Sequence, residues 1–198
     1  EITVVNIHKF DDDPNKIAIT ISAALKAMYV NAHPEIEDTY REEYIIQAVE
    51  NLAIMLKEMY PRLNGGNLPN LEDMLKMLTN YSIVEKMCEI MCQDPELAEK
   101  YSNQITYFKR NFYENAPGKA ITEQYLYLAV SQLDNLLRLP GVKTILCNRH
   151  NNIDFDKALA NGEVTFVCTR RGDLGRVSHK AFGLFFLLSM QNAVLRRP

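Results

Sequence analysis

The sequence predicts a mainly α-helical protein, in which a bundle-like all-α domain lies between two pieces of an α/β sheet. Three observations support this fold class. Apolar residues recur at helical spacing over most of residues 14–152, and short runs rich in β-branched residues stand near the two ends of the chain, at 2–7 and 164–168. The final helical segment, 177–195, is apolar around nearly its whole circumference, which is typical of a helix inside a larger protein or a membrane.

The two β-branched runs are expected to be strands. Residues 164–168 (VTFVC) follow the turn Asn161-Gly162 and precede a polar loop at 169–175 and the apolar helix 177–195. Strand, loop and buried helix in this order make half of a βαβ unit, and a parallel sheet needs several strands with both faces covered. Only residues 2–7 provide a second strand. We therefore expect the chain to be a piece of a larger α/β protein, cut at both ends.

Helix start signals organise the first part of the all-α region. Asp13 is placed to cap a helix that has Pro14 at its first position, and Pro61 is expected to end the amphipathic helix 39–60. The first helix repeats Ile17, Ile21, Ala24, Leu25 and Met28. The second is expected to bury Tyr44, Ile45, Ala48, Leu52, Met55, Leu56 and Met59, and to expose Arg41, Glu42, Glu50 and Lys57.

The second part of this region contains further caps. Asn70 with Asp73, and Ser82 with Glu85, have capping-box spacing and predict short helices at 71–78 and 83–91. Asp94-Pro95 predicts a longer helix to about residue 113. A helix from about Thr122 to 139, a short one at 142–147 and another capped by Asp154 complete the series. The expected division is residues 1–13 as a flanking strand, 14–152 as the all-α domain, and 153–198 as a flanking helix, strand and buried helix.

Aromatic and basic residues alternate along residues 101–113, where Tyr107 and Phe108 precede Lys109 and Arg110. Such a mixture can stack single-stranded bases. A helix that buries Ile105, Phe108 and Phe112 explains the same residues more simply, and we favour it.

Charge is divided unevenly along the chain. Residues 1–137 contain 12 Lys and Arg against 21 Asp and Glu, a net charge of −9, whereas residues 138–198 contain 10 against 4, a net charge of +6. The acidic part argues against a general nucleic-acid surface, because phosphate binding requires clusters of Lys and Arg. Its usual explanation is a solvated face, and a docking surface for a basic partner is the alternative. The candidate partner-binding residues cluster at one helix start: Glu35, Glu37, Asp38, Glu42 and Glu43.

Catalytic and metal-binding motifs are missing from the sequence. It contains no GxxxxGK[ST], GxGxxG, HExxH or GxSxG, and its four histidines and four cysteines have no metal-ligand spacing. No signal peptide or membrane-spanning run is recognisable, so the piece is expected to be soluble and cytoplasmic. The loop after the predicted strand carries Arg170, Arg171 and Arg176, which are candidates for contact with nucleotide phosphate or DNA. Solvated loop arginines are the simpler interpretation.

The C-terminal sequence and the order of the predicted elements resemble those of a known family. The segments IDFDKAL (153–159), GEVTFV (162–167) and GDLG (172–175), with QNA at 191–193, are similar to type IV coupling proteins of conjugative elements in Gram-positive bacteria. These are membrane-anchored, hexameric, RecA-like ATPases that deliver relaxase-bound DNA to a type IV secretion channel. In the family an all-α domain interrupts the nucleotide-binding domain between Walker A and Walker B, so the sheet flanking residues 14–152 would be RecA-like.

The resemblance implies a function for the helical region. It would be the substrate-receptor domain, which recognises relaxase and relaxosome accessory proteins, sometimes with DNA, and belongs to a hexamer that meets secretion-channel proteins. The acidic charge of this region predicts that it binds DNA only weakly by itself. Walker A would precede Glu1 and Walker B would follow Pro198, so no catalytic, cofactor-binding or metal residue is assigned here, and ATP and Mg²⁺ belong to the parent protein. The fragment alone is expected to hydrolyse no ATP. The alternatives are a fragment of a channel-assembly ATPase of the same secretion systems, or a stand-alone helical protein-interaction module.

Overall fold

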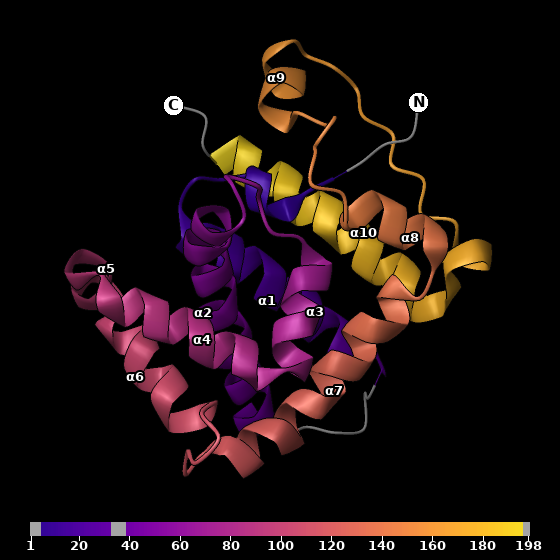
Figure 1. Cartoon of the computed structure of the whole chain (residues 1–198). Coiled ribbons are helices and arrows are strands. Elements are labelled where there is room, and N and C mark those ends of the chain that lie inside the picture. The colour runs from indigo at the N-terminus through magenta and orange to yellow at the C-terminus, as the bar shows by residue number, and fades with distance from the viewer. Residues whose placement is uncertain (1–4, 33–38, 196–198) are drawn as a thin grey trace.

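The chain is mainly helical. The computed structural model describes residues 5–32 and 39–195, and Figure 1 shows them as a succession of helices. Within those ranges the elements are η1 (Ile7–Lys9), α1 (Pro14–Ala32), α2 (Thr39–Leu63), α3 (Leu71–Thr79), α4 (Tyr81–Gln93), α5 (Pro95–Lys100), α6 (Ser102–Asn111), α7 (Lys119–Leu137), α8 (Pro140–Leu146), α9 (Phe155–Ala160) and α10 (Arg171–Leu195).

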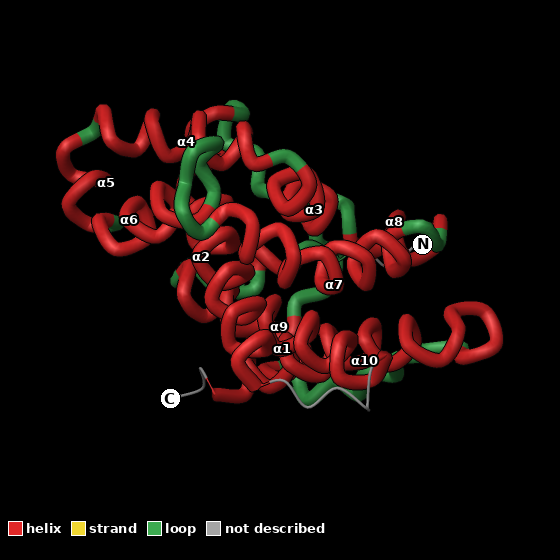
Figure 2. Tube along the Cα trace, turned by 90° about the horizontal axis from the view of Figure 1, so that it is seen from below, coloured by secondary structure: helices red, strands yellow, loops and turns green. Residues whose placement is uncertain are grey.

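The long helices stack side by side, with α1 and α2 at the centre. Helix α1 packs along α2 on one side and along α10 on the other, and both α1 and α2 contact α7. Helices α4, α5 and α6 contact one another beyond α2, away from α10 (Figure 2). This arrangement places α2 between the α1–α10 layer and the α4–α6 group, so α2 is the element that both sides share.

The apolar stripe predicted for α2 forms the middle of the core. Ile45, Ala48, Leu52, Met55, Leu56 and Met59 are buried, and Val49, Ala53 and Ile54 widen the buried face. Tyr44 is half-buried at the edge of this stripe. The same cluster of buried residues extends through every other α-helix described. A helix covered on several sides needs such a broad apolar face, because its neighbours leave little of its circumference to water.

Several predicted helix starts are confirmed. Helix α1 begins at Pro14, with the Asp13 carboxylate accepting from the Asn15 amide at 2.9 Å. The Asn70–Asp73 capping box is formed with both of its bonds, and Asp94 and Asp154 cap α5 and α9. Each cap joins residues two or three positions apart, so the local sequence contains the whole signal.

Other predicted boundaries are wrong. Pro61 lies inside α2, which continues to Leu63, and the N-cap of α4 is Asn80 rather than Ser82. The single helix expected from residue 95 to 113 is two helices with a break at Tyr101. The helix predicted from about Thr122 begins three residues earlier, at Lys119, so Thr122 lies within α7.

The described part of the chain contains no β-strand, so the strand predicted at 164–168 is wrong, and the described residues 5–7 of the other candidate are not a strand. Residues 164–168 are an exposed loop, with the side chains of Val164 and Phe166 78% and 92% exposed. Residues 2–4 of the other candidate lie outside the described ranges, and Ile7 begins the 3₁₀ turn η1. A strand is stabilised by bonds to neighbouring strands, and residues 5–7 and 164–168 have none within the described part of the chain. The all-α part of the predicted fold class is therefore confirmed, whereas the flanking sheet is not observed.

Helix α10 differs from its prediction in length and in burial. It begins at Arg171, six residues earlier than expected, and is interrupted at Gly175, whose φ of 74° is accessible mainly to glycine. Phe182, Phe185 and Phe186 are buried, but Leu187 on another face is 65% exposed. Among the described helices, none combines the length and apolar composition needed to cross a bilayer.

Candidate functional site

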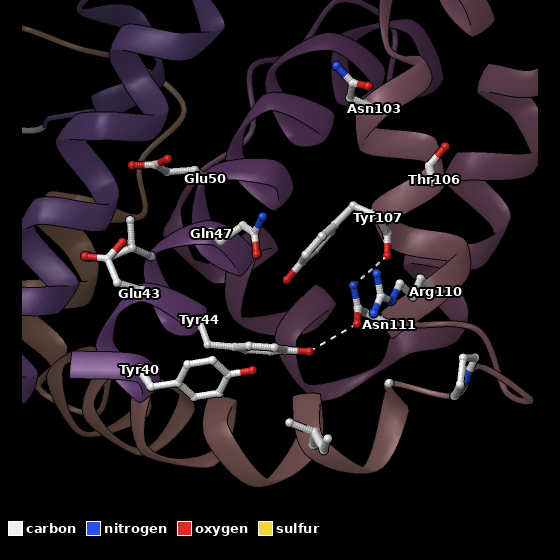
Figure 3. Close-up of a pocket in the computed structure, with 14 residues that line it drawn as sticks. Tyr40, Glu43, Tyr44, Gln47, Glu50, Asn103, Thr106, Tyr107, Arg110 and Asn111 are labelled. Carbon is white, nitrogen blue, oxygen red and sulfur yellow. Dashed lines mark hydrogen bonds between the residues drawn. The ribbon is translucent and has the colours of Figure 1, made fainter. Parts of the chain in front are cut away.

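An open groove between α2 and α6 is the best-defined candidate site. It has a volume of about 890 Å³ and also borders the loop that leads into α7. Its walls carry the tyrosines Tyr40, Tyr44 and Tyr107 and the charged residues Glu43, Glu50 and Arg110 (Figure 3). The volume lies in the range typical of ligand pockets.

Helical spacing places these side chains on common faces. On α2, residues 40, 43, 44, 47 and 50 recur every three or four positions and line the groove. On α6, residues 103, 106, 107 and 110 do the same. The opposite flank of each helix carries core residues, such as Leu52 on α2 and Phe108 on α6. Both walls therefore belong to helices that are fixed by the core.

A polar network closes one end of the groove. The Tyr44 hydroxyl donates to Asn111 Oδ1 at 3.1 Å and lies 2.8 Å from Thr122 Oγ1, which in turn donates to the Gly118 carbonyl at 2.9 Å. The Asn111 amide donates to the Tyr107 carbonyl at 2.9 Å. Asn111 and Thr122 are buried. Because buried polar groups are stabilised by such bonds, the network fixes α2, α6 and α7 relative to one another.

Gly118 permits the close approach that this network needs. Its amide donates to the Arg110 carbonyl at 3.0 Å, so the chain before α7 lies directly against the end of α6. A Cβ atom at Gly118 would lie 2.3 Å from Asn111 Oδ1 and 3.0 Å from the Arg110 carbonyl oxygen. Only glycine fits here without displacing the amide of Asn111.

The tyrosines of the groove have different partners. Tyr40 and Tyr44 each pack edge-on against Tyr125, with ring centroids 6.1 and 5.3 Å apart, and the Arg41 guanidinium lies 5.5 Å from the Tyr125 centroid. The Tyr107 hydroxyl is buried and has no hydrogen-bond partner among the residues that the structure describes. Burial raises the pKa of Tyr107 far above its ordinary value, so the phenol stays neutral.

Of the charged side chains that line the groove, only that of Glu50 has a polar partner that the structure shows. Glu50 accepts a 2.8 Å hydrogen bond from Ser22 on α1. Glu43 and Arg110 are exposed, and neither forms an ion pair within the described part of the chain. The groove thus presents a free carboxylate on α2 and a free guanidinium on α6.

The acidic cluster predicted from sequence is only partly represented here. Glu42 faces α1, where its carboxylate lies 3.2 Å from the Lys26 ammonium, and only Glu43 lines the groove. Glu35, Glu37 and Asp38 lie outside the described residues. Glu50 was not recognised as a site residue, and Tyr107 and Arg110 were considered only for base stacking, because the sequence does not show that α6 lies beside α2.

Searches against protein-family models, curated proteins and solved structures find no match for this chain. The functional argument therefore rests on its own residues.

The arginine loop lies elsewhere. Arg170 and Arg171 stand exposed at the start of α10 and do not line the groove, and the side chain of Arg176 is outside the described ones. The strand end that made this loop a candidate ligand site is absent, because residues 164–168 are not a strand. Among the described residues, no group of three His, Cys, Asp or Glu side chains is placed to hold a metal ion.

A second polar cluster joins distant loops rather than forming a site. Arg149 donates to the Leu68 carbonyl at 2.7 Å and to Asp73 Oδ2 at 2.9 Å, and its guanidinium lies 4.8 Å from the centroid of the Tyr60 ring. Asn70 donates to the Cys147 carbonyl at 2.6 Å. The donors of Arg149 and Asn70 thus bond to acceptors within the protein, so we assign this cluster a structural role.

Proposed function

We propose that residues 14–152 form the substrate-receptor domain of a type IV secretion coupling ATPase, which recognises relaxosome proteins for conjugative DNA transfer. The observation that carries this proposal is the groove on an all-α body, with glutamates on its α2 wall. A rigid helical surface with aromatic and charged side chains suits protein recognition. The resemblance of residues 153–193 to coupling proteins supplies the identity of the partners.

The charge of the helical region favours a protein partner over DNA. Residues 1–137 have a net charge of −9, and the groove contributes Glu43 and Glu50 to this balance. Relaxases and their accessory proteins bind DNA and are generally basic. Complementary charge would speed their encounter with this surface, and the same carboxylates would repel phosphate.

Two features support a parent with a RecA-like sheet. Residues 164–168 are rich in β-branched residues yet carry exposed Val164 and Phe166, and the nearby helix α10 exposes Leu187. Neighbouring strands of a nucleotide-binding domain would pair with this segment and cover both sets of side chains. In this proposal ATP and Mg²⁺ bind only to that parent domain, which would be hexameric and anchored in the cell membrane.

A titration against the cognate relaxase and its accessory protein tests the proposal. We expect saturable binding that weakens as salt concentration rises, and a further loss when Glu43 and Glu50 are both changed to Gln. Glu99→Gln on α5, where the side chain is exposed and outside the groove, is the charge control. No binding of either protein, or tighter binding of duplex DNA than of both, would reject this function.

A stand-alone helical interaction module is the second candidate. It is supported by the continuous core, in which Phe155 of α9 contacts both Phe10 and Phe186 without any sheet. Such a module would bind a partner unrelated to conjugation. The relaxase titration separates the two candidates.

A further inference from the structure

The two walls of the groove carry opposite charges that the described residues leave unmatched. Figure 3 shows Glu43 on the α2 side and Arg110 on the α6 side, with Tyr44 and Tyr107 between them. The nearby carboxylate of Glu42 already faces Lys26, and Glu50 accepts from Ser22. Glu43 and Arg110 therefore remain for a ligand that brings one charge of each sign.

The groove is formed before any ligand arrives. Its closed end is held by the bonds of Tyr44 to Asn111 and Thr122, and by the close approach of Gly118 to α6. A preformed site loses little conformational entropy on binding, so weak charge pairs can contribute to affinity there. This rigidity also fixes the separation between the Glu43 and Arg110 walls.

Aromatic rings beside the acidic wall suit a cationic side chain. Tyr40 is 68% exposed and leads into the groove one turn before Glu43. Tyr40 packs against Tyr125, and the Tyr125 ring already contacts one guanidinium, that of Arg41. An arginine or lysine of a ligand could lie over the face of a tyrosine ring and form an ion pair with the Glu43 carboxylate.

We propose that this groove binds a peptide segment whose arginine or lysine pairs with Glu43 while an acidic side chain of the same segment pairs with Arg110. This inference deepens the proposed function, on which it rests for the groove being a protein-recognition surface. It adds that the recognised segment must contain both charges, so a purely basic tail is not the best ligand. Nucleic acid is disfavoured, because Glu43 and Glu50 lie on one wall and repel phosphate.

Synthetic peptides test the charge pairing directly. The probe is a capped peptide, acetyl-Arg-Gly-Leu-Gly-Asp-amide, titrated into the ¹⁵N-labelled chain, with two further peptides in which Arg becomes Gln or Asp becomes Asn. We expect amide shifts in α2 and α6, and binding by the parent peptide about two- to five-fold tighter than by either neutralised peptide, the range for exposed ion pairs.

Substitutions in the protein then identify which charges meet. In the Glu43→Gln protein, changing Arg to Gln in the peptide should no longer weaken binding. In the Arg110→Gln protein, changing Asp to Asn in the peptide should no longer weaken binding. Glu99→Gln is the matched control and should leave all three affinities unchanged. Absence of these couplings, absence of shifts along the groove, or tighter binding there of a single-stranded oligothymidine would overturn the proposal.

The peptide and relaxase experiments fail independently. If the relaxase binds but Glu43→Gln and Arg110→Gln leave its affinity intact, the groove proposal fails and the receptor function stands. If the peptides show the predicted couplings but no relaxosome protein binds, the groove is a recognition site in a protein of another function.

Discussion

At the scale of single residues, His8 occupies an environment that disfavours its charge. Its side chain is fully buried, and within the described ranges neither ring nitrogen has a hydrogen-bond partner. Lys57 lies beside it and donates to the backbone carbonyls of His8 and Asp11. Burial lowers the pKa of Lys57, and the negative charges of Asp12 and Asp11 oppose this shift. Burial, followed by the charge of Lys57, lowers the pKa of His8 to about 3.

This lowered pKa predicts acid lability. Between pH 6.5 and about 3, the unfolded chain binds a proton at His8 that the folded chain does not, so stability is fully present above pH 6.5 and falls as the pH is lowered through this window. We expect the loss to be on the order of 4 kcal/mol by its lower end. Urea unfolding of the wild type and of His8→Leu at pH 7, 5 and 4 checks this. An equally steep loss in the variant would assign the acid sensitivity to other groups.

The two inner tyrosines of the groove should respond oppositely to loss of their hydroxyls. Tyr44→Phe removes the contacts with Asn111 and Thr122. Thr122 keeps its bond to the Gly118 carbonyl, but the buried Asn111 Oδ1 loses its partner among the described residues, so the change should destabilise the protein by about 1–2 kcal/mol. Tyr107→Phe removes a buried hydroxyl for which the described chain offers no partner, so stability should stay constant or rise by up to about 1 kcal/mol. Each is the control for the other in thermal unfolding. A loss at Tyr107 as large as that at Tyr44 would contradict this interpretation.

At the scale of elements, the junction between α6 and α7 depends on one glycine. Gly118→Ala would push a Cβ to 2.3 Å from Asn111 Oδ1, so we expect a loss of about 1–3 kcal/mol. Gly141→Ala in α8 is the control, because no described atom lies within 4 Å of the added Cβ and alanine stabilises a helix by roughly 0.5–1 kcal/mol relative to glycine. Chemical denaturation of both variants makes the comparison. Equal stability of the two would show that the junction tolerates a side chain.

Several helix starts could be predicted from sequence, but one helix interruption could not. Asn70 and Asp94 cap their helices through bonds to residues two or three positions away, so the local sequence was sufficient. The break at Tyr101 contains no glycine or proline. Its hydroxyl donates to Glu58 on α2 at 2.6 Å, across 43 residues of sequence. The groove was missed for the same reason, because its two walls come from segments that only the tertiary fold brings together.

At the scale of the whole molecule, the predicted strand and the outer face of α10 form apolar surface that the described chain does not cover. Val164 and Phe166 are mostly exposed, as are Leu187 and Leu195. The β-branched pattern was genuine, but a strand requires a neighbour that sequence composition does not guarantee.

This surface should bind an apolar dye. We expect the wild type to enhance anilinonaphthalene sulfonate fluorescence at pH 7, and a Phe166→Ser, Leu187→Gln double variant to lose most of that signal. Both side chains are exposed, so stability should change by less than about 0.5 kcal/mol. Tyr127→Ser on α7, at a similarly exposed ring, is the control and should leave the fluorescence unchanged. Undiminished fluorescence in the double variant would place the dye elsewhere.

The ring contact between Phe10 and Phe155, 5.7 Å between centroids, also constrains the order of folding. It closes a loop of about 145 residues, which costs roughly 4 kcal/mol of chain entropy if nothing within the loop has folded. The contact should therefore form late in folding, after the neighbouring helices have packed against α2. Stopped-flow measurements should show that Phe155→Leu speeds unfolding and leaves the folding rate nearly unchanged. The two ends of the helical region would then meet last, held by a body that has already assembled.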